Sequence, residues 1–347
     1  MSKSPATTNM TKQIKPHRFA AIDIGSNTFR LLIAEPSEAG ASPPWRTVCY
    51  THRIIRLGEG LHHSERLADA AMQRAMQAFS EFAAIIARHQ VAPEHIAATA
   101  TAAMREAENG LQFRDAVAAQ TGIDIRIIDG KTEAGMSLNG AAAVLHEKTR
   151  QDMLLFDIGG GSTEFIRAAN GACRDAISRK MGVVRLVEAH LHSDPPSPQD
   201  YSAMLATADA HLAVVESSWP DHLPPAALVG TAGTVTTLAA TELDLCPYDA
   251  ETINNHRMSR KSFEMLRDRL LGMNQTERQA IRTIEAGRGD LIVAGLAIIE
   301  AVMRRWHYDA MTVVDAGLLE GAWLEISHAG KEPRMNADKS RAQLSNI

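Results

Sequence analysis

The sequence contains few of the residues that mark several common classes of protein. Its three cysteines, Cys49, Cys173 and Cys246, lie far apart and without metal-ligand spacing, which argues against a disulfide framework and a structural zinc site. Aromatic residues make up only 5% of the chain, too few to favour a protein that stacks nucleic-acid bases on its rings. The 36 basic residues are outnumbered by 41 acidic ones, so a polyanionic ligand needs a local cluster of Arg and Lys.

Long apolar segments are also missing. The longest strongly apolar run, residues 291–303, contains Glu300 and is shorter than the roughly 20 residues that a membrane helix requires. Residues 1–17 are polar and have no apolar core of a signal peptide. We therefore expect a cytoplasmic protein with no membrane and no nucleic-acid partner. We also expect a disordered tail at residues 1–17 and a second tail at residues 331–347.

The rest of the sequence alternates between strand-like apolar runs and segments with helical periodicity, a pattern typical of the α/β class. Its 347 residues are enough for two domains. Helices are predicted, among other places, at residues 65–89, 131–145, 275–284 and 290–306.

An internal repeat organises the chain. Residues 21–33 (AIDIGSNTFRLLI) and 155–166 (LFDIGGGSTEFI) share an apolar run, Asp-Ile-Gly, small turn residues and a second apolar run. The two aspartates, Asp23 and Asp157, are 157 − 23 = 134 residues apart. Two copies at this spacing predict a duplicated two-domain fold with an interdomain cleft. We place domain I at residues 18–131 and domain II at 132–330, with the last helix a candidate to pack on domain I.

The chemistry of the repeat favours phosphate binding at both turns. Glycines let backbone N–H groups approach an anion, and Ser26 and Ser162 add hydroxyl donors. The alternative is a pair of ordinary hairpins with glycine turns. Seven residues after the aspartate the copies differ, with Arg30 in one and Glu164 in the other. The cation Arg30 suits contact with phosphate, and the anion Glu164 suits contact with a metal ion. The alternative is a salt bridge between these two side chains.

Several motifs make the chain resemble the exopolyphosphatase and guanosine pentaphosphate phosphohydrolase (Ppx/GppA) family. That family is a branch of the actin-like, ribonuclease H-like (ASKHA) superfamily. The resemblance covers residues 19–323. It is carried by DIGSNTFRLLI (23–33), RLGEGL (56–61), ATATAAMREAENG (98–110), GKTEA (130–134), DIGGGSTE (157–164), MGVVRL (181–186), GTAGTVTTLA (230–239), GRGDLIVAGLAII (287–299) and VVDAGLLEG (313–321).

The resemblance implies an actin-like two-domain fold and an activity. The expected reaction is Mg²⁺- or Mn²⁺-dependent hydrolysis of the terminal phosphoanhydride of inorganic polyphosphate, with release of orthophosphate. The alarmone pppGpp is the alternative substrate. An ATP-dependent kinase and a non-catalytic nucleotide-binding sensor on the same fold remain open. The family resemblance also implies a homodimer. Because the chain ends 347 − 315 = 32 residues after Asp315, we expect it to lack the helical C-terminal domain of long members.

The resemblance also implies residue roles. Glu133 matches a catalytic glutamate that orients or deprotonates water, and Asp157 and Glu164 match carboxylates that bind the metal. The residues expected to bind phosphate are Asp23, Gly25, Ser26, Asn27, Arg105, Gly159, Gly160, Gly161, Ser162, Gly233 and Thr234, to which the repeat itself adds Arg30. Arginine suits this task because its planar fork matches phosphate oxygens.

Other basic residues are candidates for lining a polyphosphate path, with a solvated surface as the alternative. They are Arg53, Arg56, Lys131, Arg179, Lys180, Arg185, Arg257, Arg260 and Lys261. For His256 we expect a structural rather than a catalytic role. Leu319 stands where many relatives have an arginine, so one phosphate contact of the family is not expected here.

Overall fold

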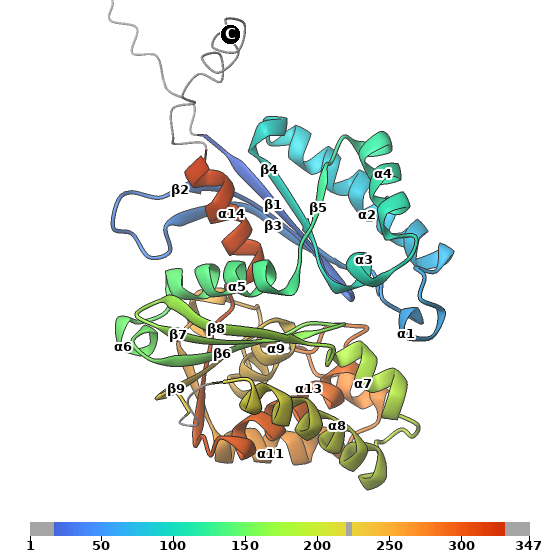
Figure 1. The fold of residues 1–347 in the computed structure, drawn as a ribbon, viewed down its shortest axis with the longest axis vertical. Coiled ribbons are helices and arrows are strands. Elements are labelled where there is room, and N and C mark those ends of the chain that lie inside the picture. The colour runs from blue at the N-terminus through green and yellow to red at the C-terminus, as the bar shows by residue number, and fades with distance from the viewer. Residues whose placement is uncertain (1–16, 220–223, 330–347) are drawn as a thin grey trace, which may run out of the picture.

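The computed structural model describes residues 17–219 and 224–329 (Figure 1). The tails predicted at residues 1–17 and 331–347 lie outside the described residues, apart from His17. Within the described ranges, no helix combines the length and the apolar character needed to cross a membrane.

The first sheet has the strand order β3-β2-β1-β4-β5. Its first three strands, β1 (Phe19–Ile24), β2 (Thr28–Pro36) and β3 (Trp45–Ile54), form an antiparallel meander. The strands β4 (Ile96–Ala100) and β5 (Ile125–Ile127) continue the sheet in parallel with β1. This order places the β1–β2 turn and the end of β4 at the same edge of the sheet.

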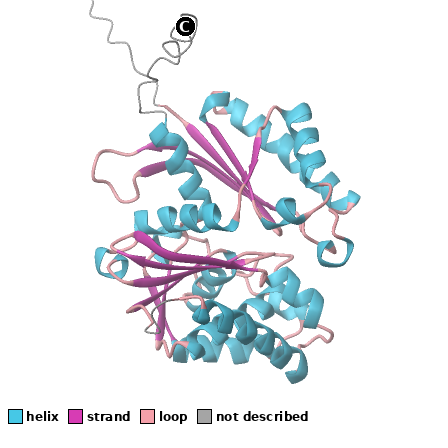
Figure 2. Ribbon diagram, viewed as in Figure 1, coloured by secondary structure: helices cyan, strands magenta, loops and turns pink. Residues whose placement is uncertain are grey.

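The second sheet repeats this order and adds one edge strand, giving β8-β7-β6-β9-β11-β10 (Figure 2). Its strands are β6 (Met153–Ile158), β7 (Thr163–Ala169), β8 (Ala172–Arg179), β9 (Ala227–Thr231), β10 (His256–Ser259) and β11 (Ala310–Val313). The first three again form an antiparallel meander, followed by parallel β9 and β11. The predicted duplicated α/β fold is therefore confirmed.

Helices cover both sheets. Beside the first sheet lie α1 (Leu61–Ser64), α2 (Asp69–Arg88), α3 (Ala102–Glu106) and α4 (Gly110–Thr121), with a single 3₁₀ turn at Pro93–His95. The second sheet is accompanied by α6 (Glu147–Arg150), α7 (Val183–His190), α8 (Pro198–Ser217), α9 (Gly233–Glu242), α10 (Ala250–Ile253), α11 (Arg260–Leu271), α12 (Gln275–Gln279) and α13 (Leu291–Arg305). We call these two assemblies the first and second lobes.

The helix predicted at residues 275–284 is too long, because α12 ends at Gln279. Ile281 and Ile284 continue the apolar pattern, but they pack on the core from turns rather than from a helix. Arg278, with 1% of its surface exposed, donates hydrogen bonds to the carbonyl oxygens of Met273 and Gly289. The buried guanidinium thus ties this turn to the loop that leads into α13.

Two helices, α5 (Gly130–Val144) and α14 (Leu318–Ala329), lie between the sheets (Figure 1). In the central strands, side chains alternate between two cores: Ile22 and Phe156 face the outer helices, whereas Ala21 and Leu155 face α5 and α14. Trp323 of α14 donates its indole N–H to the carbonyl oxygen of Phe19 at 3.1 Å. The last helix therefore packs against β1 of the first lobe.

The two central helices cross at a backbone contact. A methyl group at Gly140 of α5 would lie 2.0 Å from the carbonyl oxygen of Gly317, just before α14. A methyl group at Gly321 of α14 would lie 2.0 Å from the carbonyl oxygen of Met136. Only glycine permits this approach, so the crossing sets the position of Glu133 and Ser137 on α5.

This crossing predicts a difference between two glycines of one helix. Gly140→Ala should destabilise the protein by about 1–3 kcal/mol, because the methyl group must displace backbone. Gly135→Ala, where no atom lies within 4 Å of the added methyl group, should be neutral or stabilising by up to about 1 kcal/mol. Urea unfolding midpoints measure both. Equal midpoints for the two variants would contradict the close crossing.

Candidate active site

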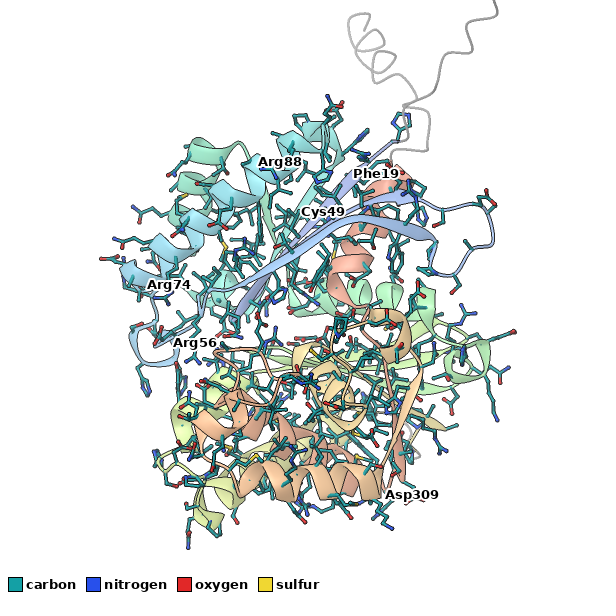
Figure 3. All side chains as sticks on the ribbon, turned by 180° about the vertical axis from the view of Figure 1, so that it is seen from behind. Phe19, Cys49, Arg56, Arg74, Arg88 and Asp309 are labelled. Carbon is teal, nitrogen blue, oxygen red and sulfur yellow. The ribbon has the colours of Figure 1, made fainter. Side chains whose placement is uncertain are left out.

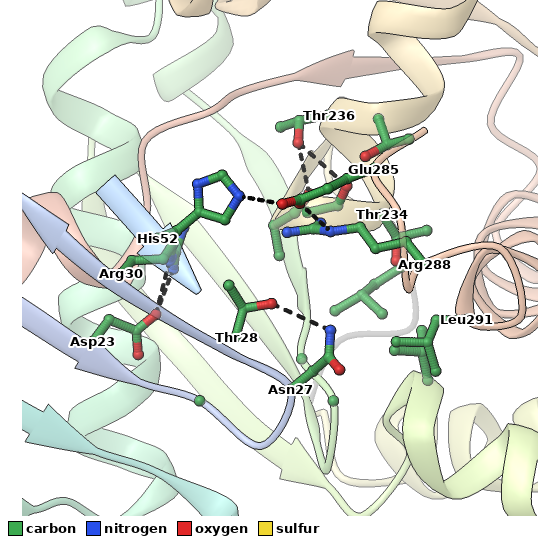
Figure 4. Close-up of a pocket in the computed structure, with 18 of the residues that line it drawn as sticks. Asp23, Asn27, Thr28, Arg30, His52, Thr234, Thr236, Glu285, Arg288 and Leu291 are labelled. Carbon is green, nitrogen blue, oxygen red and sulfur yellow. Dashed lines mark hydrogen bonds and ion pairs between the residues drawn. The ribbon is translucent and has the colours of Figure 1, made fainter. Parts of the chain in front are cut away.

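A cavity of about 800 Å³ lies between the lobes, within the size range of ligand-binding cavities (Figure 4). It brings together the β1–β2 turn, the β6–β7 turn, the start of α9 and the first turn of α5. All of the predicted site residues line it except Arg105. Three carboxylates distant in sequence, Asp23, Glu133 and Asp157, thus face one space.

The two glycine turns are built in the same way. Asp23 pairs with Arg30 across β1 and β2, and Asp157 pairs with Glu164 at the equivalent position of β6 and β7. The first turn, residues 25–28, closes with a hydrogen bond from Gly25 N to Thr28 O. The second turn, residues 159–162, closes with the corresponding bond from Gly159 N to Ser162 O at 2.9 Å. The repeat in the sequence is therefore a repeat in structure.

The first three carbonyl oxygens of the second turn point toward α7. The oxygens of Gly159 and Gly160 accept from Val183 N and Val184 N, and the oxygen of Gly161 accepts from Arg185 Nε at 2.8 Å. Because a trans peptide unit points its N–H away from its carbonyl oxygen, the next three amides face away from α7. The turn residues line the cavity, so these amides form a site for an anion.

The two turns also touch each other. A methyl group at Gly161 would lie 2.8 Å from Ser26 Oγ and 3.1 Å from Cβ of Ala102. The glycines are therefore required for contact between the lobes as well as for access to the backbone.

Three buried carboxylates share one side of the cavity. Burial and the charges of Glu164 and Asp157 raise the pKa of Glu133 well above its usual value, against the opposing effect of Arg105. Burial, with the charge of Asp157, raises the pKa of Glu164 to about 7, and burial raises the pKa of Asp157. The cluster therefore carries more negative charge than its surroundings neutralise.

Each of these carboxylates has a fixed partner. Ser137 Oγ donates to Asp157 at 2.5 Å, and Ser178 Oγ donates to Glu164 at 2.7 Å. Arg105 donates to Glu133 Oε2 at 3.1 Å and to the carbonyl oxygen of Ile128 at 2.7 Å. The structure thus places Arg105 beside Glu133 rather than in the cavity wall, where phosphate contact was expected.

The donor set fits a divalent cation that the substrate helps to bind. Among residues 17–219 and 224–329, no three His, Cys, Asp or Glu side chains form a ready-made metal site. However, Asp23 Oδ1 is buried without a hydrogen-bond partner, and burial together with the charge of Asp157 raises the pKa of Glu164. Mg²⁺ commonly uses one or two carboxylates together with water and substrate phosphates. Asp157 and Glu164 can supply those carboxylates.

Arg30 bonds within its own lobe. Its Nη2 and Nε atoms lie 2.7 and 2.9 Å from Asp23 Oδ2. The alternative salt bridge between Arg30 and Glu164 is therefore not formed. Figure 4 shows Arg30 joined to Asp23, and both residues line the cavity, where Arg30 can contact a bound anion.

Most of the other basic candidates do not line the cavity, and Arg53 alone among the nine does. Arg56 pairs with Asp290 at 3.0 Å, where the lobes meet, and Arg260 binds backbone carbonyl oxygens near Asp309, at the far end of the second lobe (Figure 3). His256 pairs with Glu242 at 2.8 Å, outside the cavity. The guanidinium groups of Arg56 and Arg260 are thus engaged in a salt bridge and in hydrogen bonds to the backbone, although the sequence alone allowed them to face a ligand.

Sequence reasoning missed several residues of the cavity. His52 of β3 binds Glu285 of the second lobe at 2.7 Å, and Glu285 in turn lies 3.1 Å from Arg288 Nε (Figure 4). Tyr248 donates to Asp315 at 2.5 Å. Arg288 and Asp315 belong to the GRGDL and VVDAG motifs, so the sequence contained a signal for them but no indication of their roles.

The lining as a whole is acidic. It contains six carboxylates, Asp23, Glu133, Asp157, Glu164, Glu285 and Asp315, against four arginines, Arg30, Arg53, Arg282 and Arg288. An anionic ligand must therefore rely on backbone amides, on a few arginines and on accompanying cations.

Comparison with known proteins supports a specific family. A model of the Ppx/GppA phosphatase family matches residues 35–329. Exopolyphosphatase 2 of Mycobacterium tuberculosis is 33% identical over 319 residues, which cover 89% of this chain and 98% of that protein. Guanosine-5'-triphosphate,3'-diphosphate pyrophosphatase of Vibrio atlanticus is 29% identical over 91% of this chain and 61% of that protein.

Solved structures agree with these sequence matches. A crystal structure of an exopolyphosphatase from Cytophaga hutchinsonii superimposes with a TM-score of 0.81 and 28% identity, covering 90% of this chain and 98% of that chain. The Ppx/GppA family member of Aquifex aeolicus superimposes with a TM-score of 0.76 and 27% identity, covering 92% and 100%.

One buried acid near the cavity predicts a pH-dependent stability. Burial raises the pKa of Glu320 to about 7 from its usual 4.5, and the nearby Asp315 adds to this against the opposing pull of Arg30. Between these pH values the folded state retains a proton that the unfolded chain has lost, so stability falls as the pH rises.

Glu320→Gln should remove this fall, because an amide does not ionise and can still accept the bond from Gly317 N. Relative to the unmodified protein, the variant should gain about 3 kcal/mol at pH 8 and little at pH 4.5. Unfolding midpoints measured across this pH range provide the test. A gain that does not vary with pH would contradict a raised pKa for Glu320.

Proposed function

The chain belongs to the Ppx/GppA phosphatase family, and we propose that it hydrolyses the terminal phosphoanhydride of inorganic polyphosphate and releases orthophosphate. The observation that carries this proposal is the convergence of two amide-lined turns and Glu133 on one cavity. The exopolyphosphatase of Mycobacterium tuberculosis, which the match covers over 98% of its length, supports the choice of polyphosphate.

The reaction requires a held phosphoryl group, a directed water molecule and neutralised charge. The backbone amides of the second turn and the turn of residues 25–28 would bind the terminal phosphate. Ser26, Asn27 and Ser162 lie on these turns and add side-chain donors. Arg30, beside the first turn, would contact phosphate oxygens while its bonds to Asp23 hold it in place.

Glu133 is the proposed general base. Its side chain is buried in the first turn of α5, and burial raises its pKa, which makes the ionised carboxylate a stronger base than that of an exposed glutamate. The carboxylate takes a proton from water as the water oxygen bonds to the terminal phosphorus. The bridging P–O bond then breaks, and the shortened chain leaves with the bonding electrons. Arg105 holds Glu133 in orientation through its bond at 3.1 Å.

Asp157 and Glu164 are the proposed ligands of Mg²⁺ or Mn²⁺. When bound, such a cation would neutralise charge on the phosphate oxygens. Ser137 and Ser178 fix the two carboxylates in place. At the start of α9, Gly233 and Thr234 would contact phosphates further from the scissile bond.

The second candidate substrate is pppGpp. The acidic lining favours it over a long polymer, because much of a nucleotide is uncharged. The rings of Tyr50 and Tyr248 and several threonine hydroxyls also line the cavity, and they would contact the base and ribose of a nucleotide. A kinase and a non-catalytic sensor are less well supported, since Glu133 stands where water must be activated. Cytoplasmic location and a homodimer remain predictions.

The first test of the proposed function removes the base. Glu133→Gln keeps the shape of the side chain but cannot take a proton, so kcat should fall by about 10²–10⁴. Phosphate release is measured in parallel from polyphosphate, pppGpp and ATP. Glu147→Gln, on an exposed residue of α6, is the matched control and should retain full activity. Near-normal turnover of every substrate by Glu133→Gln would remove the assignment.

The second test concerns the cation. Because three buried carboxylates repel one another and the phosphate, removal of divalent cations with EDTA should abolish phosphate release. Adding Mg²⁺ or Mn²⁺ in excess should restore it, and adding Na⁺ at matched ionic strength should not. Undiminished activity in EDTA would rule out the proposed metal site.

A further inference from the structure

Arg185, one of the candidates from the sequence for lining a polyphosphate path, has a different place in the structure. It does not line the main cavity. Its guanidinium lies behind the second turn, with 16% of the side chain exposed. From there it reaches both the turn and the first lobe.

The contact with the turn is through the backbone. Arg185 Nε donates to Gly161 O at 2.8 Å. This bond completes the set of three that turn the carbonyl oxygens of residues 159–161 toward α7. The first two bonds come from backbone N–H groups, but the third comes from a side chain. The orientation of the peptide between Gly161 and Ser162 therefore depends on Arg185.

The first turn supplies a comparison within the same molecule. Its carbonyl oxygens, at Ser26 and Asn27, accept only from the backbone: from Gly58 N at 2.8 Å, and from Ile55 N and Arg56 N at 2.8 and 2.9 Å. The side chain of Arg56 instead reaches Asp290 and the carbonyl oxygen of Gly287 in the second lobe. A side chain is thus needed to complete only the second turn.

The other bonds of Arg185 cross to the first lobe. Its Nη2 binds Glu106 at the end of α3, and its Nη1 lies 3.3 Å from His62 Nδ1. Glu106 is also bound by Lys180 at 3.3 Å. These contacts occupy the Nη1 and Nη2 atoms on the far side of the guanidinium, so that Nε alone bonds to Gly161 O.

We propose that Arg185 is a positioning residue that holds the Gly161–Ser162 amide in its anion-binding direction. The proposal rests on the proposed function, because it assigns the second turn to a phosphate group. Arg185 itself touches neither the phosphate nor the attacking water.

The first experiment compares Arg185→Lys with the unmodified protein. A lysine retains the charge but has no planar fork, so it cannot bind Gly161 O and Glu106 together in the same way. Isothermal calorimetry with orthophosphate in Mg²⁺ should show a Kd raised by about tenfold or more. Steady-state kinetics should show a matching rise in KM. A change of Kd below about twofold would overturn the proposal.

The second experiment distinguishes an effect of Arg185 on the second turn from an effect on the contact between the lobes. Glu106→Gln weakens the cross-lobe ion pair but leaves the bond from Arg185 Nε to Gly161 O, so the Kd for orthophosphate should change by less than about threefold. Lys180→Met removes the exposed second partner of Glu106 and should have no effect. If Glu106→Gln weakens phosphate binding as much as Arg185→Lys does, the lobe contact is the cause and the proposal is wrong.

Two measurements distinguish loss of the Arg185 contact from unfolding of a variant and from absence of the proposed activity. Thermal unfolding of each variant identifies loss of folding, and Arg185→Gln provides a second substitution if the lysine variant is unstable. Failure of the unmodified protein to release phosphate from any substrate would remove the proposed function. The comparison of orthophosphate Kd values would still decide whether Arg185 orients the turn, since it requires anion binding and no turnover.

Discussion

The direction in which planar peptide units point is the constraint on which this site depends. A glycine turn has no preferred direction of its own, because its backbone can adopt many conformations. In both lobes, the segment that follows the third strand binds the carbonyl oxygens of the turn. The amides of the second turn must then face the opposite way, toward the cavity. Anion binding is therefore a consequence of how the turn packs, and the side chains of Ser26 and Ser162 only add to it.

Charge balance is the second feature of the site. A cavity lined by six carboxylates and four arginines is poorly suited to a bare polyanion. The raised pKa of Glu164 reflects burial close to another acid, and a cation would relieve that repulsion. A phosphate ligand and a cation would therefore favour each other's binding. Burial and the neighbouring acids likewise keep the pKa of Glu133 raised although Arg105 lies beside it.

Part of this was predictable from sequence because it is local. The repeat around Asp23 and Asp157 predicted two strand–turn–strand units, and both formed with the same register. Helical periodicity located α2 and α13 to within a few residues. It failed after α12, where Ile281 and Ile284 match a helical pattern but reach the core from turns stabilised by Arg278. Hydrophobic periodicity indicates which residues are buried, but it does not determine whether a helix or a turn carries them.

The sequence by itself determined the α/β class, the duplicated strand–turn–strand units, the glycines of the turns and four of the six acidic residues that line the cavity. Only the tertiary structure decided which basic residues remain free to meet a ligand. Arg56 and Arg185 bind acids 234 and 79 residues away in the chain, at Asp290 and Glu106. The physical reason is that a charged side chain binds whichever partner folding brings beside it. That partner depends on how the two lobes pack together, about which the neighbouring residues in the sequence carry no information.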